Sequence, residues 1–460
     1  MITATAFAGK HYAVYGLARS GLATVKALIA SGAKVTAWDA NEQTREAAVD
    51  EVIQLSHDLD HVELKIADLD EVDLAHFDSL VVTPGLPLNR HPIAQRARDA
   101  GVEIIGDIEL FARARPELPP HKVVGITGTN GKSTTTALVH HILKTAGVPT
   151  TMGGNIGLPI LAQDPLPKGG VYVLELSSYQ IDLTRSLDCD VAVLLNTTPD
   201  HLDRYESFEA YAASKARLFE MQRAGLAVIT DQDEPTRRIL AALAQRPSIG
   251  TKFPDYGGML IWRIEPGRVL RPMVIPGETP FGQSDWPSLA GPHNAQNAAA
   301  AIVTCRALCL DNDQIGEGLR TYPGLSHRME RIREKDGVLF VNDSKATNPT
   351  ATAPALAAFD RIRWILGGQP KTDSLDECAP HFGHVRCAYT IGDAADLFER
   401  LLKPHIPVKN CGKLEVAVRE AAQDSEAGDT VLLSPACASF DQFRDFEDRG
   451  DQFRELVRGL

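Results

Sequence analysis

The sequence lacks most of the features that mark extracellular, membrane or nucleic-acid-binding proteins. Seven cysteines are scattered over 460 residues with no CxxC pair, which is not the pattern of a disulfide framework or a zinc site. No run of about 18 apolar residues occurs, so we expect no membrane-spanning helix. The formal charge of −13 argues against a broad polyanion-binding surface, because nucleic-acid-binding proteins usually carry a basic face.

Targeting signals and repeats are also absent. The N-terminal stretch MITATAFAGKHYAV has neither the charged start nor the long apolar run of a signal peptide. No solenoid repeat, low-complexity tract or heptad run occurs. We therefore expect a cytoplasmic protein without nucleic-acid or membrane partners, and a monomer. Cys305 and Cys309, four residues apart on a run with helical character, are expected to face a core rather than a metal.

What the sequence does contain is a succession of α/β patterns. Its length exceeds what one core usually holds, since single domains seldom pass about 250–300 residues. Apolar runs closed by polar or Gly/Pro residues alternate with helical runs, which is typical of parallel sheets. A different pattern, WRIEPGRVLRPMV, predicts a hairpin turning at Pro266-Gly267. The predicted strands are residues 11–16, 33–40, 78–87, 122–128, 171–178, 192–200, 337–344, 361–368, 387–393 and 429–436.

The stretch GITGTNGKSTT, residues 125–135, resembles a phosphate-binding loop with an altered spacing. The usual pattern places a glycine five residues before Gly131, where this chain has Ile126. An apolar strand precedes the loop and a helix follows it, so backbone N–H groups and the helix N-terminus can bind phosphate. Lys132 can reach the terminal phosphates, and Ser133 or Thr134 can bind Mg²⁺. The sequence therefore predicts a nucleotide site.

Two further polar residues follow predicted strands. Glu175 ends VYVLE, where a metal-binding acid would stand opposite the phosphate loop, although a carboxylate can also cap the next helix. His201 lies in NTTPDHLDRY, and ligands bind at the carboxyl ends of parallel strands; a satisfied structural histidine is an equally open interpretation. No Asn-Lys-x-Asp guanine signature occurs, which disfavours a GTPase.

The N-terminal unit contains an imperfect dinucleotide fingerprint. Gly16 and Gly21 frame GLARSG, and Asp39 ends the second predicted strand, as a ribose-binding acid would. The middle glycine is Ala18, which would hinder close approach of a pyrophosphate. An NAD-dependent dehydrogenase is therefore an alternative hypothesis, but it leaves the phosphate loop unexplained. A sugar-nucleotide sensor without enzymatic activity is a further alternative.

A larger set of motifs identifies a family. GTNGKSTT, GGNIG, LELSSYQ, NTTPDHLDRY, YAASKARLF, GPHNAQN, GLSHRME, NDSKATNP and LSPACASFDQF occur in this order and closely resemble the Mur ligases of peptidoglycan synthesis. The resemblance covers about residues 10–455. The loop variant is shared with folylpolyglutamate synthetases, whereas NDSKATNP and SPACASFDQFRDFEDRG are typical of the Mur ligases that attach D-glutamate. Another Mur ligase or a folylpolyglutamate synthetase is the nearest alternative.

The resemblance implies the fold, the domains and the reaction. It implies a Rossmann-like N-terminal UDP-binding domain (1–113), a central P-loop ATPase-like domain with a parallel sheet (114–323) and a C-terminal Rossmann-like α/β domain (324–460). The implied reaction joins D-glutamate to UDP-N-acetylmuramoyl-L-alanine, with ATP as co-substrate and Mg²⁺ at two sites. An acyl phosphate and a tetrahedral intermediate would precede the amide.

The resemblance also assigns roles to single residues. Lys132, Glu175, His201 and Lys215 are the implied catalytic residues. Glu175 and His201 would serve a second Mg²⁺, and Lys215 would react with CO₂ to give a carbamate that supports the metal site. From the sequence pattern alone, Lys215 would be a solvated helix lysine.

The ligand contacts implied by the resemblance fall into four sets. The ATP set is Gly128, Thr129, Asn130, Gly131, Lys132, Ser133, Thr134, Asn294, Asn297, His327, Arg328, Asp343 and Lys345. The UDP-substrate set is Arg19, Ser20, Asp39, Thr83, Pro84, Gly85, Asn155 and His201. The D-glutamate set is Thr347, Lys371, Ser439, Phe440 and Phe446, whereas Phe443 is expected in a helical core stripe. The metal set is Ser133, Thr134, Glu175, His201 and the carbamate of Lys215.

Overall fold

The computed structural model describes residues 1–56, 63–200, 203–230, 233–244, 252–253, 256–257, 261–264, 285–289 and 292–460. The chain divides into two compact units. The first is Met1–Gly282 with Pro292–Arg320, and the second is Gln283–Gly291 with Thr321–Leu460. Within the described ranges, no helix is both long and apolar enough to cross a membrane.

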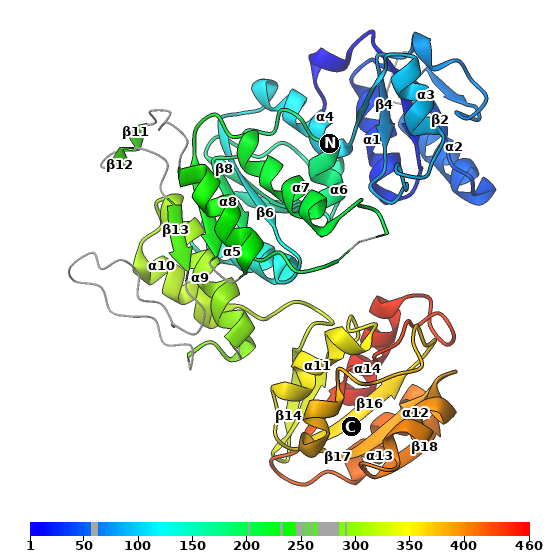
Figure 1. Cartoon of the computed structure of the whole chain (residues 1–460), viewed down its shortest axis with the longest axis vertical. Coiled ribbons are helices and arrows are strands. Elements are labelled where there is room, and N and C mark those ends of the chain that lie inside the picture. Colours follow the sequence, from blue (N-terminus) through cyan, green and yellow to red (C-terminus); the bar gives the residue numbers. More distant parts are fainter. Residues whose placement is uncertain are drawn as a thin grey trace. The chain divides into compact units, whose positions relative to one another are not determined.

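The first unit begins with a parallel sheet of five strands in the order β3-β2-β1-β4-β5 (Figure 1). Along β1, Tyr12 and Val14 pack in one core cluster while Ala13 and Tyr15 pack in another. Both faces of the sheet are therefore covered, which explains the continuous apolar run of this strand. The elements are β1 (His11–Tyr15), α1 (Arg19–Ala30), β2 (Lys34–Trp38), α2 (Glu42–Ser56), β3 (Leu64–Ile66), β4 (Ser79–Val82), α3 (Ile93–Asp99), β5 (Glu103–Ile105) and α4 (Asp107–Ala114).

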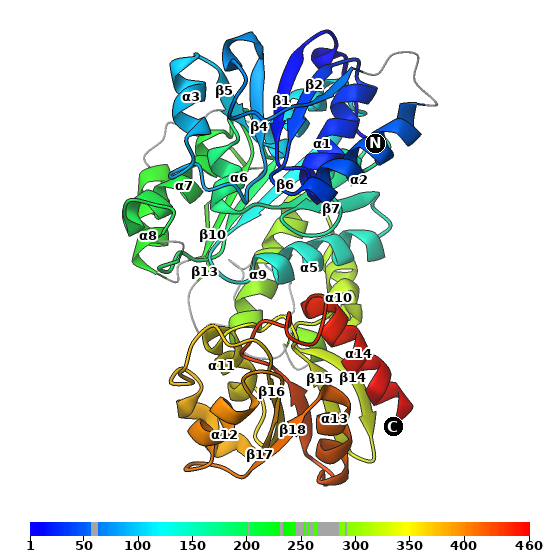
Figure 2. The same cartoon turned by 90° about the vertical axis from the view of Figure 1, so that its right-hand side faces the viewer.

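A second parallel sheet in the same unit has the order β13-β10-β9-β6-β8-β7. Strand β6 lies inside it between β8 and β9, and helices α5 and α9 pack side by side (Figure 2). The elements are β6 (His121–Thr127), α5 (Lys132–Thr145), β7 (Thr150–Gly154), β8 (Gly170–Glu175), α6 (Ser178–Asp182), β9 (Val191–Leu194), α7 (Phe208–Glu220), β10 (Leu226–Thr230), α8 (Glu234–Ala244), β11 (Lys252–Phe253), β12 (Tyr256–Gly257), β13 (Ile261–Ile264), α9 (Pro292–Ala307) and α10 (Asn312–Thr321).

The second unit contains a six-stranded sheet in the order β14-β15-β19-β16-β17-β18. All its pairs are parallel except the hairpin of β14 and β15. Leu366 and Leu432 face one core cluster, and Ile365 and Leu433 face the other. The elements are β14 (Glu330–Lys335), β15 (Val338–Asn342), α11 (Pro349–Ala357), β16 (Ile362–Gly367), β17 (Val385–Ile391), α12 (Ala395–Leu402), β18 (Val408–Gly412), α13 (Leu414–Gln423), β19 (Thr430–Leu433) and α14 (Phe446–Gly459).

The structure confirms the predicted α/β class: the described residues form three large sheets of mostly parallel strands, and β11 and β12 form a small antiparallel pair. Cys305 is buried as predicted, but Cys309 is exposed with φ of 70°. The prediction that both face a core was wrong for Cys309 because helix α9 ends at Ala307, so the helical spacing does not continue to this residue. The predicted turn at Pro266-Gly267 lies outside the described residues. The domain boundaries at 113/114 and 323/324 stay predictions.

Candidate active site

The predicted phosphate loop joins strand β6 to helix α5. Gly128 has φ of 154° and Gly131 has φ of 84°, conformations that residues with a Cβ rarely adopt. A Cβ on Gly131 would stand 2.2 Å from Oδ1 of Asn297, at the start of α9. The loop and α9 therefore approach too closely for any larger residue at this position.

The unusual spacing of the loop has a packing explanation. Ile126 is a buried residue of β6 and pairs with Glu175 of β8. A Cβ on Gly125 would lie 2.8 Å from Sγ of Cys189, so this glycine admits a core side chain. The glycines of the loop itself are thus Gly128 and Gly131, and Gly125 belongs to the strand.

Asn196, two residues after the end of β9, anchors the phosphate loop. Its Oδ1 accepts hydrogen bonds from the backbone N–H of Thr129 at 3.1 Å and of Asn130 at 2.7 Å. Its Nδ2 donates to the carbonyl of Asn130. Sequence reasoning missed this residue; the available signal was a polar side chain at the end of the strand beside β6.

Two lysines converge on the carbonyls of the loop. Lys132 Nζ donates to the carbonyl oxygens of Gly128 at 2.9 Å and Thr129 at 2.8 Å. Lys215 Nζ, from α7, donates to the same Gly128 oxygen at 3.0 Å. The structure therefore brings together the predicted phosphate lysine and the predicted carbamate lysine.

Lys215 is in an unusual environment for a lysine. It is 1% exposed, and its Nζ lies 4.4 Å from the centroid of the Tyr211 ring. Burial and then the positive charge of Lys132 lower the pKa of Lys215 to about 7. The hydroxyl of Tyr211 lies 3.1 Å from Oγ1 of Thr129, so this tyrosine connects Lys215 to the loop. The expectation of a solvated lysine from its sequence pattern alone was wrong, because a helix pattern does not reveal what packs on it.

Glu175, at the end of β8, has one carboxylate oxygen without a partner among the described residues. Its Oε1 accepts from Nδ2 of Asn155 at 2.8 Å. Its Oε2 is buried and makes no hydrogen bond with any residue that the structure describes. A buried, unpartnered carboxylate oxygen is costly unless a ligand or cation satisfies it. His201 lies outside the described residues, so its predicted role beside Glu175 stays a prediction.

Four of the predicted UDP residues, Arg19, Ser20, Asp39 and Thr83, lie on α1 or near the turn after β1. Gly16 has φ of 95°, and a Cβ there would stand 2.4 Å from Oγ1 of Thr83. Asp39 accepts a hydrogen bond from the backbone N–H of Leu17 at 2.7 Å. Ser20 lies in the first turn of α1, and the neighbouring Arg19 donates to the carbonyl of Gly157 at 3.0 Å. Asp39 thus holds the turn after β1, and Arg19 connects α1 to the segment that follows β7.

Arg204 holds the loop after β4. Its guanidinium donates to the carbonyls of Pro84, Gly85 and Leu86 at 3.3, 3.3 and 2.8 Å. It also stacks 4.3 Å from the centroid of the Tyr179 ring. Sequence reasoning did not single out Arg204, although it stands in the NTTPDHLDRY motif. One side chain thus links the predicted UDP loop to the segment that follows His201.

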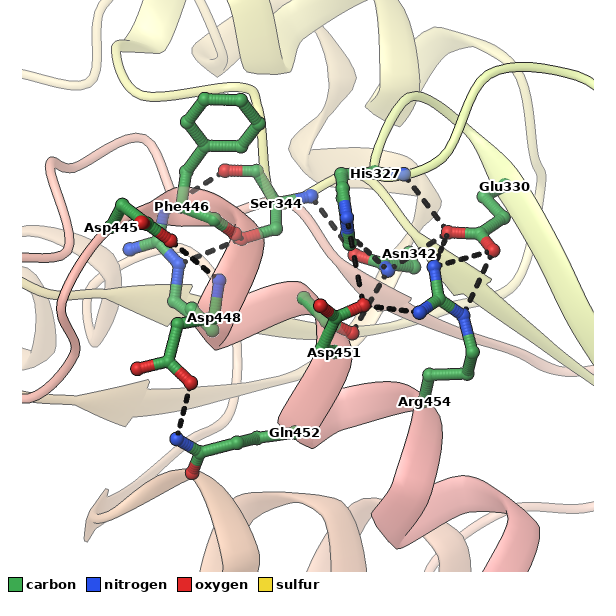
Figure 3. A network of polar contacts seen from close by, with 12 residues as sticks. His327, Glu330, Asn342, Ser344, Asp445, Phe446, Asp448, Asp451, Gln452 and Arg454 are labelled. Atoms are coloured by element: carbon green, nitrogen blue, oxygen red, sulfur yellow. Dashed lines mark hydrogen bonds and ion pairs between the residues drawn. The ribbon is translucent and has the colours of Figure 1, made fainter. Parts of the chain in front are cut away.

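His327, one of the predicted ATP residues of the second unit, lies beside Glu330 of β14 and Asn342 of β15 (Figure 3). The backbone N–H of His327 and Nδ2 of Asn342 both donate to Glu330. Burial lowers the pKa of His327, whose φ of 61° turns the chain before Arg328. Asp343 is buried, and its carboxylate accepts from Oγ of Ser434 at 2.8 Å. Burial raises the pKa of Asp343 to about 7.

The predicted D-glutamate residues include a lysine and an exposed aromatic ring. Lys371 Nζ donates to Oγ1 of Thr347 at 3.3 Å, and Lys345 Nζ lies 5.2 Å from the ring centroid of Phe446. Phe440 is 68% exposed, whereas Ser439 is buried. The structure brings Lys371 to Thr347 and Lys345 to Phe446. Phe443 packs against a core cluster as predicted, but the prediction that it lies in a helical stripe was wrong, because α14 begins only at Phe446.

Arg449 of α14 connects the loops that carry these residues, and sequence reasoning missed it. Its guanidinium is fully buried and makes five hydrogen bonds, to Oγ and the carbonyl of Ser344 and to the carbonyls of Gly367, Cys437 and Ala438. No carboxylate is among these partners. Arg449 therefore ties three separate loops together.

A glycine loop between a buried parallel strand and a helix, with a lysine at the helix start, defines a nucleotide-binding α/β protein. Family models match three successive segments: the MurD-like N-terminal domain of Mur ligases over residues 10–106, the Mur ligase middle domain over 126–305 and the Mur ligase glutamate ligase domain over 327–437. A curated relative from Novosphingobium aromaticivorans is 57% identical over 100% of this chain and 97% of its own length. The chain belongs to the Mur ligase family.

Similar proteins carry consistent names. The relative from Novosphingobium aromaticivorans and one from Zymomonas mobilis, 52% identical over the full length of both chains, are each named UDP-N-acetylmuramoylalanine–D-glutamate ligase. Among solved structures, the UDP-N-acetylmuramate-alanine ligase MurC of Thermotoga maritima matches with a TM-score of 0.57 and 18% identity, over 98% of this chain and 99% of that one. Escherichia coli FolC matches with a TM-score of 0.51 and 18% identity, over 77% and 93%. At 18% identity, both structural matches show only that the fold is shared.

Proposed function

We propose that this protein is an ATP-dependent ligase that joins D-glutamate to UDP-N-acetylmuramoyl-L-alanine in peptidoglycan precursor synthesis, forming ADP and phosphate. The observation that carries the proposal is the full-length identity of 52–57% to ligases named for this reaction. The phosphate loop with Lys132 and Lys215 supports it independently, because both lysines converge on one loop carbonyl.

The chemistry requires that a carboxylate become an electrophile. The γ-phosphoryl group of ATP passes to the carboxylate of the L-alanyl end, giving an acyl phosphate. The amine of D-glutamate then attacks the acyl carbon, and the tetrahedral intermediate expels phosphate. Lys132 would leave the carbonyls of Gly128 and Thr129 and hold the γ-phosphate, where its charge offsets the repulsion between two anions.

The residues at Glu175 fit a magnesium ion. The unpartnered buried Oε2 of Glu175 is a hard oxygen donor of the kind that Mg²⁺ prefers. Ser133 and Thr134 would hold a first ion beside the loop, and Glu175 and His201 a second. When bound, Mg²⁺ would neutralise charge on the phosphates and on the substrate carboxylate. Asn155 keeps Glu175 oriented through its hydrogen bond to Oε1.

Lys215 is suited to carbamate formation. A pKa lowered to about 7 leaves a substantial fraction of the amine neutral near neutral pH. The ammonium group first loses one proton, and the neutral nitrogen would then attack the carbon of CO₂, forming an N–C bond and releasing a second proton. A cation thereby becomes an anion. The anion would then support the metal site, whereas an unmodified lysine would repel it.

The residues proposed for the two substrates belong to different units. The residues proposed for the UDP substrate lie after β1, β2, β4 and β7, and those for D-glutamate lie on loops of the second unit. Glutamate brings two carboxylates, for which Lys371 and the hydroxyl groups of Thr347 and Ser439 are the proposed partners. Asn294 and Asn297 are proposed to contact the adenine and ribose, together with Arg328, Asp343 and Lys345.

One assay tests the proposed function. Phosphate release from ATP is measured with UDP-N-acetylmuramoyl-L-alanine and, in turn, D-glutamate, L-glutamate and diaminopimelate. Of these three amino acids, we expect only D-glutamate to cause phosphate release. Release with L-glutamate or diaminopimelate but not with D-glutamate would assign the chain to another branch of the family.

A further inference from the structure

A cavity of about 390 Å³ in the first unit is not explained by the proposed reaction. One side of the cavity is formed by α3, β5 and the loop after β4. The other side is formed by α6 together with Arg204 and Tyr205. Its volume falls within the range of about 300–1,000 Å³ that is typical of small-molecule sites. No residue of the phosphate loop lines it, and of the described residues proposed for the UDP substrate only Pro84 does.

The cavity is rich in arginine although the chain as a whole has a formal charge of −13. Arg98, Arg185 and Arg204 line it. Arg98 donates to Oε1 of Gln95, and Arg204 donates to backbone carbonyls. Within the described part of the chain, neither of these two arginines forms an ion pair.

Glu103 and Asp182, two carboxylates at the cavity, also bind other partners. Arg185 lies 3.5 Å from Glu103, but Glu103 already accepts two hydrogen bonds from Arg113 at 2.7 and 3.0 Å. Asp182, the acidic residue in the wall, lies 3.2 Å from Arg217 and accepts from the hydroxyl of Tyr205 at 2.7 Å. Among the described residues that line the cavity, three are arginines and one, Asp182, is acidic, so the lining itself has more positive than negative side chains.

The rest of the wall is apolar or aromatic. Leu86, Leu88, Val102, Ile104 and Leu183 contribute aliphatic surface. The rings of Tyr179 and Tyr205 stack with centroids 5.9 Å apart and an interplanar angle of 12°. A ligand that fits this lining has an anionic group for the arginines and an apolar body for the leucines and tyrosines.

We propose that this cavity is a second binding site, which takes a small amphipathic anion: an aryl or alkyl group that carries a phosphate or a carboxylate. The anionic group lies between Arg98 and Arg185, and the apolar body lies against Leu88 and Val102. The site is separate from the phosphate loop and borders the loop after β4, whose carbonyls accept hydrogen bonds from Arg204.

Isothermal titration of the full-length protein with phenyl phosphate tests this site. ADP and UDP are present at saturation throughout, so that the phosphate loop and the uridine site are occupied. We expect one phenyl phosphate per chain. Benzoate distinguishes a carboxylate ligand from a phosphate ligand, and benzyl alcohol is the neutral counterpart, for which we expect at least about tenfold weaker binding, as for loss of a charge-assisted contact.

Substitutions locate the bound probe. Arg185→Gln is expected to weaken binding of phenyl phosphate about tenfold or more, and Val102→Trp, which fills the cavity, is expected to abolish it. Arg223→Gln is the matched control, because Arg223 is an exposed arginine of the same unit outside the cavity. Unfolding midpoints equal to the wild type show that each variant is folded.

Three results would overturn the proposal: no binding of phenyl phosphate or benzoate, equal affinity for the Arg185→Gln and Arg223→Gln variants, or equal affinity for benzyl alcohol. Because the readout is binding in the presence of both nucleotides, these outcomes do not depend on whether D-glutamate is the amino acid that the enzyme ligates.

Discussion

At the scale of single residues, the buried amine of Lys215 carries the most specific expectation. We predict that Lys215→Ala ligates D-glutamate at a rate near background, because the negative charge of the carbamate is lost. Short-chain carboxylates such as acetate or propionate should restore part of the activity, since they can occupy the space of the missing group. The measurement is phosphate release with and without each carboxylate.

The control for this prediction is Lys144→Ala, at the far end of α5, which should keep wild-type activity and show no response to carboxylates. Full activity of Lys215→Ala without any supplement would contradict a carbamate at this position. If the variant is inactive and no carboxylate restores activity, Lys215 acts through its hydrogen bond to Gly128 and not through a carbamate.

Asp343 makes a prediction about pH. Its pKa in the folded protein is raised to about 7 by burial, whereas it is about 3.9 in an unfolded chain. Between these values the folded state holds a proton that the unfolded state has released, so the contribution of Asp343 to stability falls as pH rises from about 4 to about 7. Above pH 7 the buried charge persists and the contribution is constant.

Asp343→Asn removes this titration and keeps the shape of the side chain. We predict that the free energy of unfolding of the wild type, relative to this variant, decreases by up to about 1.4 kcal/mol per pH unit across that window. Urea denaturation at several pH values measures it. A difference that is independent of pH between 4 and 7 would contradict the raised pKa.

At the scale of elements, helix α14 connects loops through Arg449. We predict that Arg449→Lys destabilises the protein by about 2 kcal/mol or more, because lysine cannot reach all the carbonyls and leaves buried acceptors unpaired. The KM for D-glutamate should rise as well, because Cys437 and Ala438 directly precede Ser439 and Phe440. Chemical denaturation and steady-state kinetics measure the two effects.

Arg458→Lys is the matched control on the same helix, since Arg458 is exposed near its C-terminal end. This change should alter the free energy of unfolding by no more than about 0.5 kcal/mol and leave the KM for D-glutamate unchanged. Equal effects of the two substitutions would exclude a specific role of Arg449.

The elements differ in how far the sequence alone could predict them. The strand before the phosphate loop and the helix after it follow from local patterns, and both were predicted. Sequence reasoning missed the hairpin of β14 and β15, although its turn, Asp336-Gly337, is a local signal for a hairpin. The ties made by Asn196, Arg204 and Arg449 join residues far apart in the chain, so no local pattern reveals them. The burial of Lys215 belongs to the same class: the resemblance to the family indicated its importance, but its pattern alone suggested solvent.

At the scale of the whole molecule, the proposed reaction requires the two units to meet at one ATP. Lys132 and Asn297 belong to the first unit, whereas Asp343 and Lys345 belong to the second. If both sets contact the same nucleotide, then ligand binding must favour a closed arrangement over others. A ligand can favour closure only if it contacts both units. ATP meets this condition, because its proposed contacts lie in both units, whereas the proposed contacts of the UDP substrate lie in the first unit.

We predict that a non-hydrolysable ATP analogue together with UDP-N-acetylmuramoyl-L-alanine lowers the radius of gyration measured by small-angle X-ray scattering. The UDP substrate alone should change it little, because its proposed residues lie within the first unit. Lys345→Ala, which removes a proposed ATP contact of the second unit, should weaken the compaction while leaving binding of the UDP substrate intact. A scattering profile that both ligands together leave unchanged would mean that the second unit does not close on the nucleotide, and the ATP roles of Asp343 and Lys345 would then have to be abandoned.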